Sequence, residues 1–291
     1  MRHFDPQIKN YDPNRMVIIN NFSIPQLNRY RTVRIYLPVD YKDSHHTYPV
    51  IYMHDGQNVF EPSLCIAGMS WQAGEQLDDL QHNSAFTGAI IVAIDCSPER
   101  GYIGRRDEYS PWPYAPIMAL SSWPDAQIPQ GGEGHQYCQF LVDTLKPYID
   151  AHYRTKPQRE HTIITGSSMG GLISLYAAIR YPSVFSKAGV FSPAFWFARQ
   201  PMINFIAAAD INLPLEIYMD IGTNETSDPD NPEFPALYHD FAVELAEQLQ
   251  HCSPLLQCEL LIDHGGIHSE SAWAMRFPNM LKQFFMSSVL A

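Results

Sequence analysis

The sequence lacks the features that define several broad classes of protein. Its 291 residues contain no apolar run of the length that a transmembrane helix requires, and the N-terminus has no apolar signal-peptide core. Basic residues are scarce, since 19 Lys and Arg stand against 31 Asp and Glu, and the net charge is −12 with no basic run. An acidic chain of this kind is a poor candidate for binding nucleic acid or an anionic membrane. These absences predict a cytoplasmic protein that binds neither.

Motifs for metals and cofactors are also absent from the sequence. The chain has no His-Glu-x-x-His, no zinc-like spacing of Cys and His, and no glycine-rich dinucleotide or phosphate fingerprint. We therefore expect neither a metal nor a cofactor. The cysteines are odd in number and include no Cys-x-x-Cys, which predicts buried or half-buried thiols. They are Cys65, Cys96, Cys138, Cys252 and Cys258.

The composition is that of an ordinary globular protein, 45% hydrophobic and 17% charged, without internal repeats or linkers. Near-continuous apolar runs, typical of strands buried on both faces, alternate with segments of helical periodicity. The strand-like runs are 16–24, 32–37, 50–53, 89–94, 162–165, 188–191, 215–221 and 258–262, and the helical segments are 136–149, 172–179, 236–249 and 269–286. This alternation predicts one α/β domain over residues 1–291, with a mostly parallel central sheet flanked by helices.

One short motif indicates nucleophilic chemistry. Gly166-Ser167-Ser168-Met169-Gly170 is a Gly-x-Ser-x-Gly sequence between a predicted strand and a predicted helix. That setting is the one that a nucleophile elbow requires, with the serine hydroxyl projecting from the C-terminal edge of the sheet. Ser168 is therefore the candidate nucleophile, and the alternative is a strand-to-helix turn without a catalytic role.

A serine hydroxyl needs a base within reach, and His268 is the favoured candidate. It lies just past the last predicted strand, at a helix start, in a loop whose two glycines let the chain reach back over the sheet edge. His264 is the alternative, although it is nearer to the strand. The other interpretation is that His268 is a solvated loop histidine without a catalytic role.

The base in turn needs an acid that orients it, and the chain order at such an elbow is Ser, acid, His. Glu225 follows the predicted strand 215–221 and is the favoured acid. Asp228, in a proline-rich turn, is the alternative. Asp220 falls inside the strand, where we expect a structural role.

The reaction also needs two N–H donors for the developing oxyanion. One is expected from Met169, the residue after the nucleophile. The other is expected from Gln57, in the loop that follows the strand-like run 50–53. An ordinary β-turn is the alternative interpretation of that loop.

The long stretch 97–134 is rich in Pro, Gly and aromatic residues, and a loop of this length in a compact domain is usually functional. We expect it to shape the substrate pocket together with the aromatic residues that follow the strand-like run 188–191. The candidate substrate-binding residues are Trp112, Trp123, Phe195 and Trp196. The alternative is that these aromatic side chains only pack under the loop.

Several segments together resemble a known family. They are 166–172 (the elbow), 54–60 (the oxyanion loop), 105–111, 191–196 and 268–276. The chain resembles, over roughly residues 30–285, the esterase D-like or putative esterase branch of the α/β-hydrolases. That branch includes feruloyl and acetyl-xylan esterases, enterochelin esterase and mycolyltransferases. The resemblance implies an α/β-hydrolase fold without a separate cap domain, and a triad of Ser168, His268 and Glu225.

These observations predict a serine esterase that hydrolyses carboxylic esters through an acyl-enzyme intermediate, with a small-molecule ester as its partner. An acyltransferase that uses the same residues and a non-catalytic binding protein of the same fold are the alternatives. The substrate and the oligomeric state stay open, and a homodimer is one option.

Overall fold

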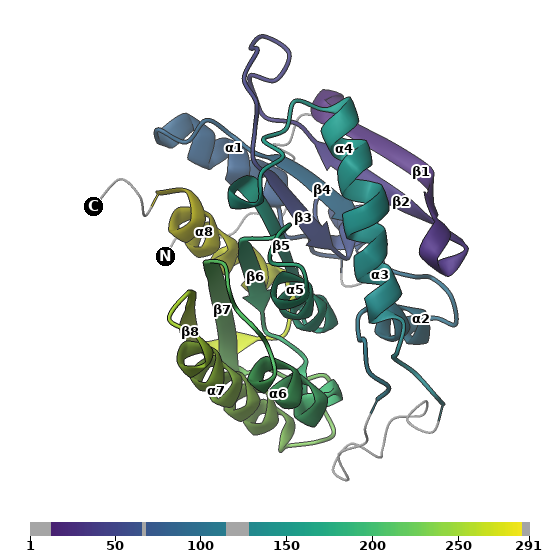
Figure 1. Cartoon of the computed structure of the whole chain (residues 1–291), viewed down its shortest axis with the longest axis vertical. Helices are drawn as coiled ribbons and strands as arrows, with labels where there is room; N and C mark the ends of the chain where they lie inside the picture. Colours follow the sequence, from purple (N-terminus) through teal and green to yellow (C-terminus); the bar gives the residue numbers. More distant parts are fainter. Residues whose placement is uncertain (1–12, 66–67, 115–127, 287–291) are drawn as a thin grey trace.

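The structure, a computed structural model, describes residues 13–65, 68–114 and 128–286. Its centre is an eight-stranded sheet with helices on both faces (Figure 1). The strands are β1 (Met16–Ile24), β2 (Arg29–Tyr36), β3 (Val50–His54), β4 (Ile90–Ile94), β5 (Thr162–Ser167), β6 (Lys187–Phe191), β7 (Leu215–Asn224) and β8 (Leu256–Ile267).

The strand order in the sheet is β1-β2-β4-β3-β5-β6-β7-β8. The hairpin β1–β2 and the pair β2–β4 are antiparallel, and every pair from β4 to β8 is parallel. Because parallel neighbours need crossover connections, helices cover both faces. The predicted α/β class with a mostly parallel sheet is confirmed.

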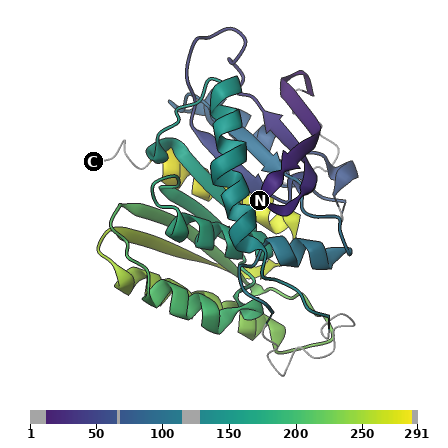
Figure 2. The same ribbon diagram turned by 45° about the vertical axis from the view of Figure 1, so that its right-hand side comes forward.

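Two layers of helices cover the sheet (Figure 1 and Figure 2). The helices are α1 (Ala73–Asn83), α2 (Tyr102–Glu108), α3 (Gly134–Phe140), α4 (Lys146–His152), α5 (Met169–Arg180), α6 (Arg199–Ala207), α7 (Phe234–Cys252) and α8 (Glu270–Met286). Side chains of β3 alternate between the two cores. Val50 and Tyr52 join the core formed with α3 to α7, whereas Ile51 and Met53 join the core formed with α1 and α8.

The structure differs from the sequence-based expectation mainly in short or polar elements. The stretch 97–134 is not irregular throughout, because it contains the seven-residue helix α2. Helix α1 was not predicted, since most of its eleven residues are polar or charged and only Ala73, Gly74 and Leu77 are buried. Strands β7 and β8 extend several residues beyond the predicted runs. This extension sets where Glu225 and His268 follow the two strands.

The five cysteines are free thiols, buried or partly buried, as predicted. Burial raises the pKa of Cys65, Cys96 and Cys258 to about 12. Burial also raises the pKa of Cys138 and of Cys252. As for membranes, the helices in the described ranges are all too short or too polar to span a bilayer.

Candidate active site

Ser168 lies at the sharp junction between β5 and α5. Its backbone has φ 59° and ψ −121°, a conformation that costs free energy and that only the surrounding structure maintains. Backbone hydrogen bonds fix it: the N–H of Ser168 donates to the carbonyl of Phe191 at 2.9 Å, and its own carbonyl accepts from Ala194 at 3.0 Å. A Cβ at Gly166 would lie only 3.0 Å from the backbone carbonyl carbon of Gly170, so the absence of a side chain lets β5 and α5 approach closely.

The two expected oxyanion donors belong to the starts of two helical turns. Met169 is the first residue of α5, so its N–H has no acceptor within the helix. Gln57 lies in the 3₁₀ turn Gly56–Asn58, directly after β3. Because β3 and β5 are parallel neighbours, their carboxyl ends bring both turns to one edge of the sheet.

The loop around Gln57 is fixed by buried polar contacts. Both carboxylate oxygens of Asp55 accept hydrogen bonds from Arg105 at 2.7 Å, a bidentate geometry that also fixes orientation. The N–H of Asp55 donates to the hydroxyl of Tyr109 at 3.0 Å. On the other side of the loop, the Asn58 amide donates to Glu270 at 2.9 Å, which ties the loop to the start of α8. The loop is therefore anchored at both ends.

The last pair of strands brings the candidate acid and base together. Asn224 of β7 pairs with Ile267 of β8, so the next residues along the two strands are Glu225 and His268. The strands approach closely here, because a Cβ at Gly222 would lie 2.3 Å from a backbone oxygen of β8. The extension of both strands beyond their predicted ends thus sets the position of this pair.

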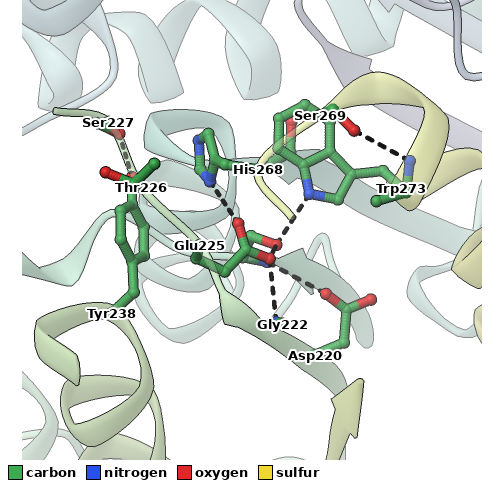
Figure 3. A network of polar contacts seen from close by, with 12 residues as sticks. Asp220, Gly222, Glu225, Thr226, Ser227, Tyr238, His268, Ser269 and Trp273 are labelled. Atoms are coloured by element: carbon green, nitrogen blue, oxygen red, sulfur yellow. Dashed lines mark hydrogen bonds and ion pairs between the residues drawn. The ribbon is translucent and has the colours of Figure 1, made fainter. Parts of the chain in front are cut away.

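Glu225 and His268 are hydrogen-bonded, with 2.7 Å between Oε2 and Nδ1 (Figure 3). The other carboxylate oxygen of Glu225 accepts from the N–H of Gly222 at 3.0 Å and from the hydroxyl of Ser192 at 2.5 Å. Complete burial raises the pKa of Glu225, but the hydrogen bond from His268 and the contacts with Ser192 and Arg276 outweigh it. The pKa is therefore held below its ordinary value, and the carboxylate is ionised at neutral pH.

A buried polar network supports this carboxylate. The hydroxyl of Ser192 accepts from the indole N–H of Trp273 at 2.8 Å and from Arg276 at 3.0 Å. The Arg276 guanidinium lies 3.3 Å from Glu225 and 3.5 Å from Asp220. Burial raises the pKa of Asp220 to about 7, although Arg276 opposes that shift. The network therefore holds one cation between two carboxyl groups.

The imidazole of His268 is also fixed by aromatic rings on two sides. Its ring centroid lies 4.9 Å from that of Tyr238 and 4.9 Å from that of Trp273. With Nδ1 bonded to Glu225, the other ring nitrogen, Nε2, is left for a reactant. No hydrogen bond joins His268 to Ser168 within the described chain, and such contacts often tighten only when a substrate binds.

The alternative base, His264, and the alternative acid, Asp228, lie in other surroundings. His264 is exposed and belongs to β8. Asp228 accepts the N–H of Asp230 at 3.1 Å and so caps a local turn. The hydrogen bond to His268 is made by Glu225.

The predicted substrate-binding residues are mostly buried. Trp112 packs edge-on against Tyr176 and Phe205. Trp196 is 3% exposed and Phe195 has no exposed surface, so burial favours a packing role for Phe195. Trp123 lies outside the described residues. Contact of any of these residues with a substrate stays a prediction.

Several residues that shape the site have no signal of their own in the sequence. Ser192, Arg276 and Arg105 stand out only as parts of the family-like segments, and Tyr238 does not stand out at all. The one available signal was the charged or polar residue inside an otherwise apolar segment, which marks Arg276 and Asp220 as buried charges in need of partners. Over the described ranges, no group of three or more Asp, Glu, His and Cys side chains is arranged to hold a metal ion.

Comparison with known proteins identifies the class. Residues 24–284 match the family described as putative esterase, so the chain belongs to that family and is a carboxylic ester hydrolase. The Bacillus subtilis (strain 168) protein YbbA, described as uncharacterized, is 25% identical over 255 residues, which cover 88% of this chain and 92% of YbbA. The ferri-bacillibactin esterase BesA of the same organism is 27% identical over 148 residues, which cover 50% of this chain and 48% of BesA.

A solved structure gives the same result for the fold. The structure of an IroE-like serine hydrolase from Shewanella oneidensis matches with a TM-score of 0.73 at 20% identity, and the match covers 92% of this chain and 80% of that one. The predicted α/β-hydrolase fold and the predicted esterase class are both confirmed.

Proposed function

We propose that the protein is a serine esterase that cleaves carboxylic esters through a Ser168–His268–Glu225 triad and an acyl-enzyme intermediate. The observation that carries the proposal is the 2.7 Å hydrogen bond between His268 and a fully buried, ionised Glu225, at the sheet edge where Ser168 occupies a strained turn. A buried carboxylate that orients a histidine beside such a serine is the arrangement that activates a hydroxyl nucleophile.

The geometry supports the following sequence of steps. Nε2 of His268 takes the proton of Ser168 as Oγ attacks the carbonyl carbon, and Glu225 stabilises the imidazolium that forms. The backbone N–H groups of Gln57 and Met169 receive the negative charge that develops on the carbonyl oxygen. His268 then gives the proton to the departing alcohol, and a water molecule activated by His268 hydrolyses the acyl-enzyme.

The anchoring of the oxyanion loop supports the role of Gln57. An N–H donor is effective only when its direction is fixed before the charge develops, and removing one such donor costs about 10²–10³-fold in kcat. The bidentate Asp55–Arg105 pair and the Asn58–Glu270 hydrogen bond supply that rigidity on either side of Gln57.

We propose that the substrate is a small-molecule ester and that the side chains of Trp112 and Trp196 shape the pocket that binds it. BesA is a ferri-bacillibactin esterase by its description, which makes siderophore esters one class to test alongside short acyl esters of p-nitrophenol.

Labelling with a fluorophosphonate tests the proposal directly, because this reagent phosphonylates a serine only when the serine is activated. We expect a single label, which peptide mass spectrometry should locate at Ser168. Ester hydrolysis should stop as the protein becomes labelled. The adjacent Ser167 provides a matched control: Ser167→Ala should still be labelled, whereas Ser168→Ala should not. Labelling elsewhere, or none, would overturn the assignment.

Hydrolysis and acyl transfer are separated by the products. The same reaction run with an added alcohol releases free acid if the enzyme is an esterase. Formation of a new ester in place of the acid would indicate the acyltransferase that the sequence also allows.

A further inference from the structure

Tyr238 occupies a position beside the triad that neither the family-like segments nor the proposed mechanism uses. It lies near the start of α7, is 1% exposed, and its ring packs against the imidazole of His268 with 4.9 Å between centroids and 44° between the planes (Figure 3). Its hydroxyl lies 2.6 Å from the hydroxyl of Ser227. Both ends of this side chain therefore have defined neighbours.

The side chain of Ser168 lies close enough to the Tyr238 hydroxyl to lower the pKa of the phenol. Burial raises the pKa of Tyr238 to about 12, against the opposing contacts with Ser227, Trp196 and Ser168. The phenol is therefore protonated at neutral pH and keeps both a donor and an acceptor function. Tyr238 therefore packs on the candidate base and lies beside the candidate nucleophile.

We infer that Tyr238 is a positioning residue of the esterase: its ring holds His268, while its hydroxyl, itself fixed by Ser227, holds the Ser168 side chain within reach of Nε2. This inference rests on the proposed triad. Glu225 fixes Nδ1 of His268 and Trp273 packs on another side of the ring, so these contacts of both residues act on the base. Tyr238 supplies the link between the two reacting side chains.

The physical reason is the small number of constraints on Ser168. Its backbone is rigid, yet its hydroxyl can turn about a single bond, and a misplacement of about 1 Å can cost 10²-fold in rate. A neighbouring hydroxyl that is already bonded to a second partner removes much of that freedom. If Tyr238 only filled space, its hydroxyl would contribute to stability and not to the reactivity of Ser168.

Tyr238→Phe tests the inference because it removes the hydroxyl and keeps the ring on His268. The matched control is Tyr48→Phe. Tyr48 is also fully buried and its hydroxyl also lies 2.6 Å from a serine, Ser44, but it precedes the amino end of β3, at the edge of the sheet away from the site. The measurements are the second-order rate of fluorophosphonate labelling, and kcat and KM for a p-nitrophenyl ester.

We expect Tyr238→Phe to lower the labelling rate and kcat by about tenfold, with KM changed less than twofold, because positioning acts on the chemical step. Tyr48→Phe should leave all three within twofold of wild type. Ser227→Ala keeps the phenol but frees it, so its labelling rate should fall between those of wild type and Tyr238→Phe.

The outcomes separate this inference from the proposed function. If wild-type protein is not labelled at Ser168, the proposed triad fails. If it is labelled and Tyr238→Phe is labelled within twofold of the wild-type rate, the triad stands and the inference about Tyr238 is wrong. Should Tyr238→Phe not fold, Ser227→Ala decides, and a wild-type labelling rate in that variant overturns the inference.

Discussion

The turn that carries the candidate nucleophile and the candidate acid–base pair are held in place in different ways. Ser168 is fixed by its own backbone, through the junction of β5 and α5 and hydrogen bonds to neighbouring main chain. Glu225 is fixed by side chains from distant parts of the chain, namely Ser192, His268 and Arg276. We therefore expect the first feature, which is local, to tolerate loss of the Ser168 side chain, and we expect changes at the second to alter activity and stability together.

The largest expected effect is on the nucleophile side. Ser168→Ala should lower kcat by about 10³-fold or more, because the attacking atom is lost. The free energy of unfolding should change by less than about 0.5 kcal/mol, since the backbone contacts remain. Ester hydrolysis and urea unfolding on the same preparation check both values. A folded variant with near-native activity would remove Ser168 from the mechanism.

On the acid–base side, activity and stability should fall together. His268→Ala removes the group that moves the proton. Glu225→Gln should retain at least about tenfold more activity than His268→Ala, because the acid only orients the imidazole and stabilises the imidazolium. Glu225→Gln should also cost about 3 kcal/mol of stability, since it leaves the buried Arg276 without one of its carboxylates. Kinetics and urea unfolding of both variants test this. Full activity in Glu225→Gln together with loss of activity in Asp228→Asn would show that Asp228, and not Glu225, is the acid.

A smaller effect is expected from the hydroxyl that bridges the network. Ser192→Ala removes the partner of Glu225, Trp273 and Arg276, so we expect about tenfold lower kcat and a loss of about 1–3 kcal/mol. Ser186, just before β6, is the matched control, because its buried hydroxyl has no hydrogen-bond partner in the described ranges. Ser186→Ala should leave kcat and the unfolding free energy unchanged; equal effects in both variants would remove Ser192 from the support of Glu225.

The oxyanion loop should respond more weakly still. Asp55→Asn keeps the size of the side chain and suits the backbone φ of 56°, but it removes the charge that pairs with Arg105. We expect about fivefold lower kcat and a loss of about 2 kcal/mol, because the loop loses rigidity while its N–H donors remain. Steady-state kinetics and thermal unfolding measure the two changes. Unchanged kcat would show that the loop does not need this pair.

The smallest effect is expected in the pH dependence of the unfolding free energy, to which the carboxyl groups of Asp220 and Glu225 contribute with opposite signs. The pKa of Asp220 is raised from 3.8 to about 7 by burial, so its ionisation costs the folded state stability as the pH rises through this window. The unfolding free energy of Asp220→Asn, relative to wild type, should therefore be higher at pH 8 than at pH 5. The pKa of Glu225 is lowered, so its ionised form stabilises the folded protein. This contribution to the free energy of unfolding is complete above about pH 4.5 and is lost as the pH falls below that value. Urea unfolding across pH 3–8 tests both signs.

The sequence predicts the local features of the site and misses the assembled ones. The alternation of apolar runs predicted the sheet, and the Gly-x-Ser-x-Gly motif predicted the turn at Ser168, because both depend on neighbours in the chain. Glu225 was preferred over Asp228 by its place after a strand, but the register that sets Asn224 opposite Ile267 is a property of the folded sheet. Tyr238 had no signal at all, since one tyrosine in an amphipathic helix is indistinguishable from core packing.

The burial of the thiols has a consequence for selective chemistry. Cysteine reacts as a thiolate, and every cysteine of this chain has a raised pKa, so little thiolate exists at neutral pH. Electrophiles that ordinarily modify cysteine first should therefore react slowly with these thiols. A dye, a spin label or a surface linker carried on a serine-directed warhead would then attach at one oxygen atom, without any need to replace the five cysteines beforehand.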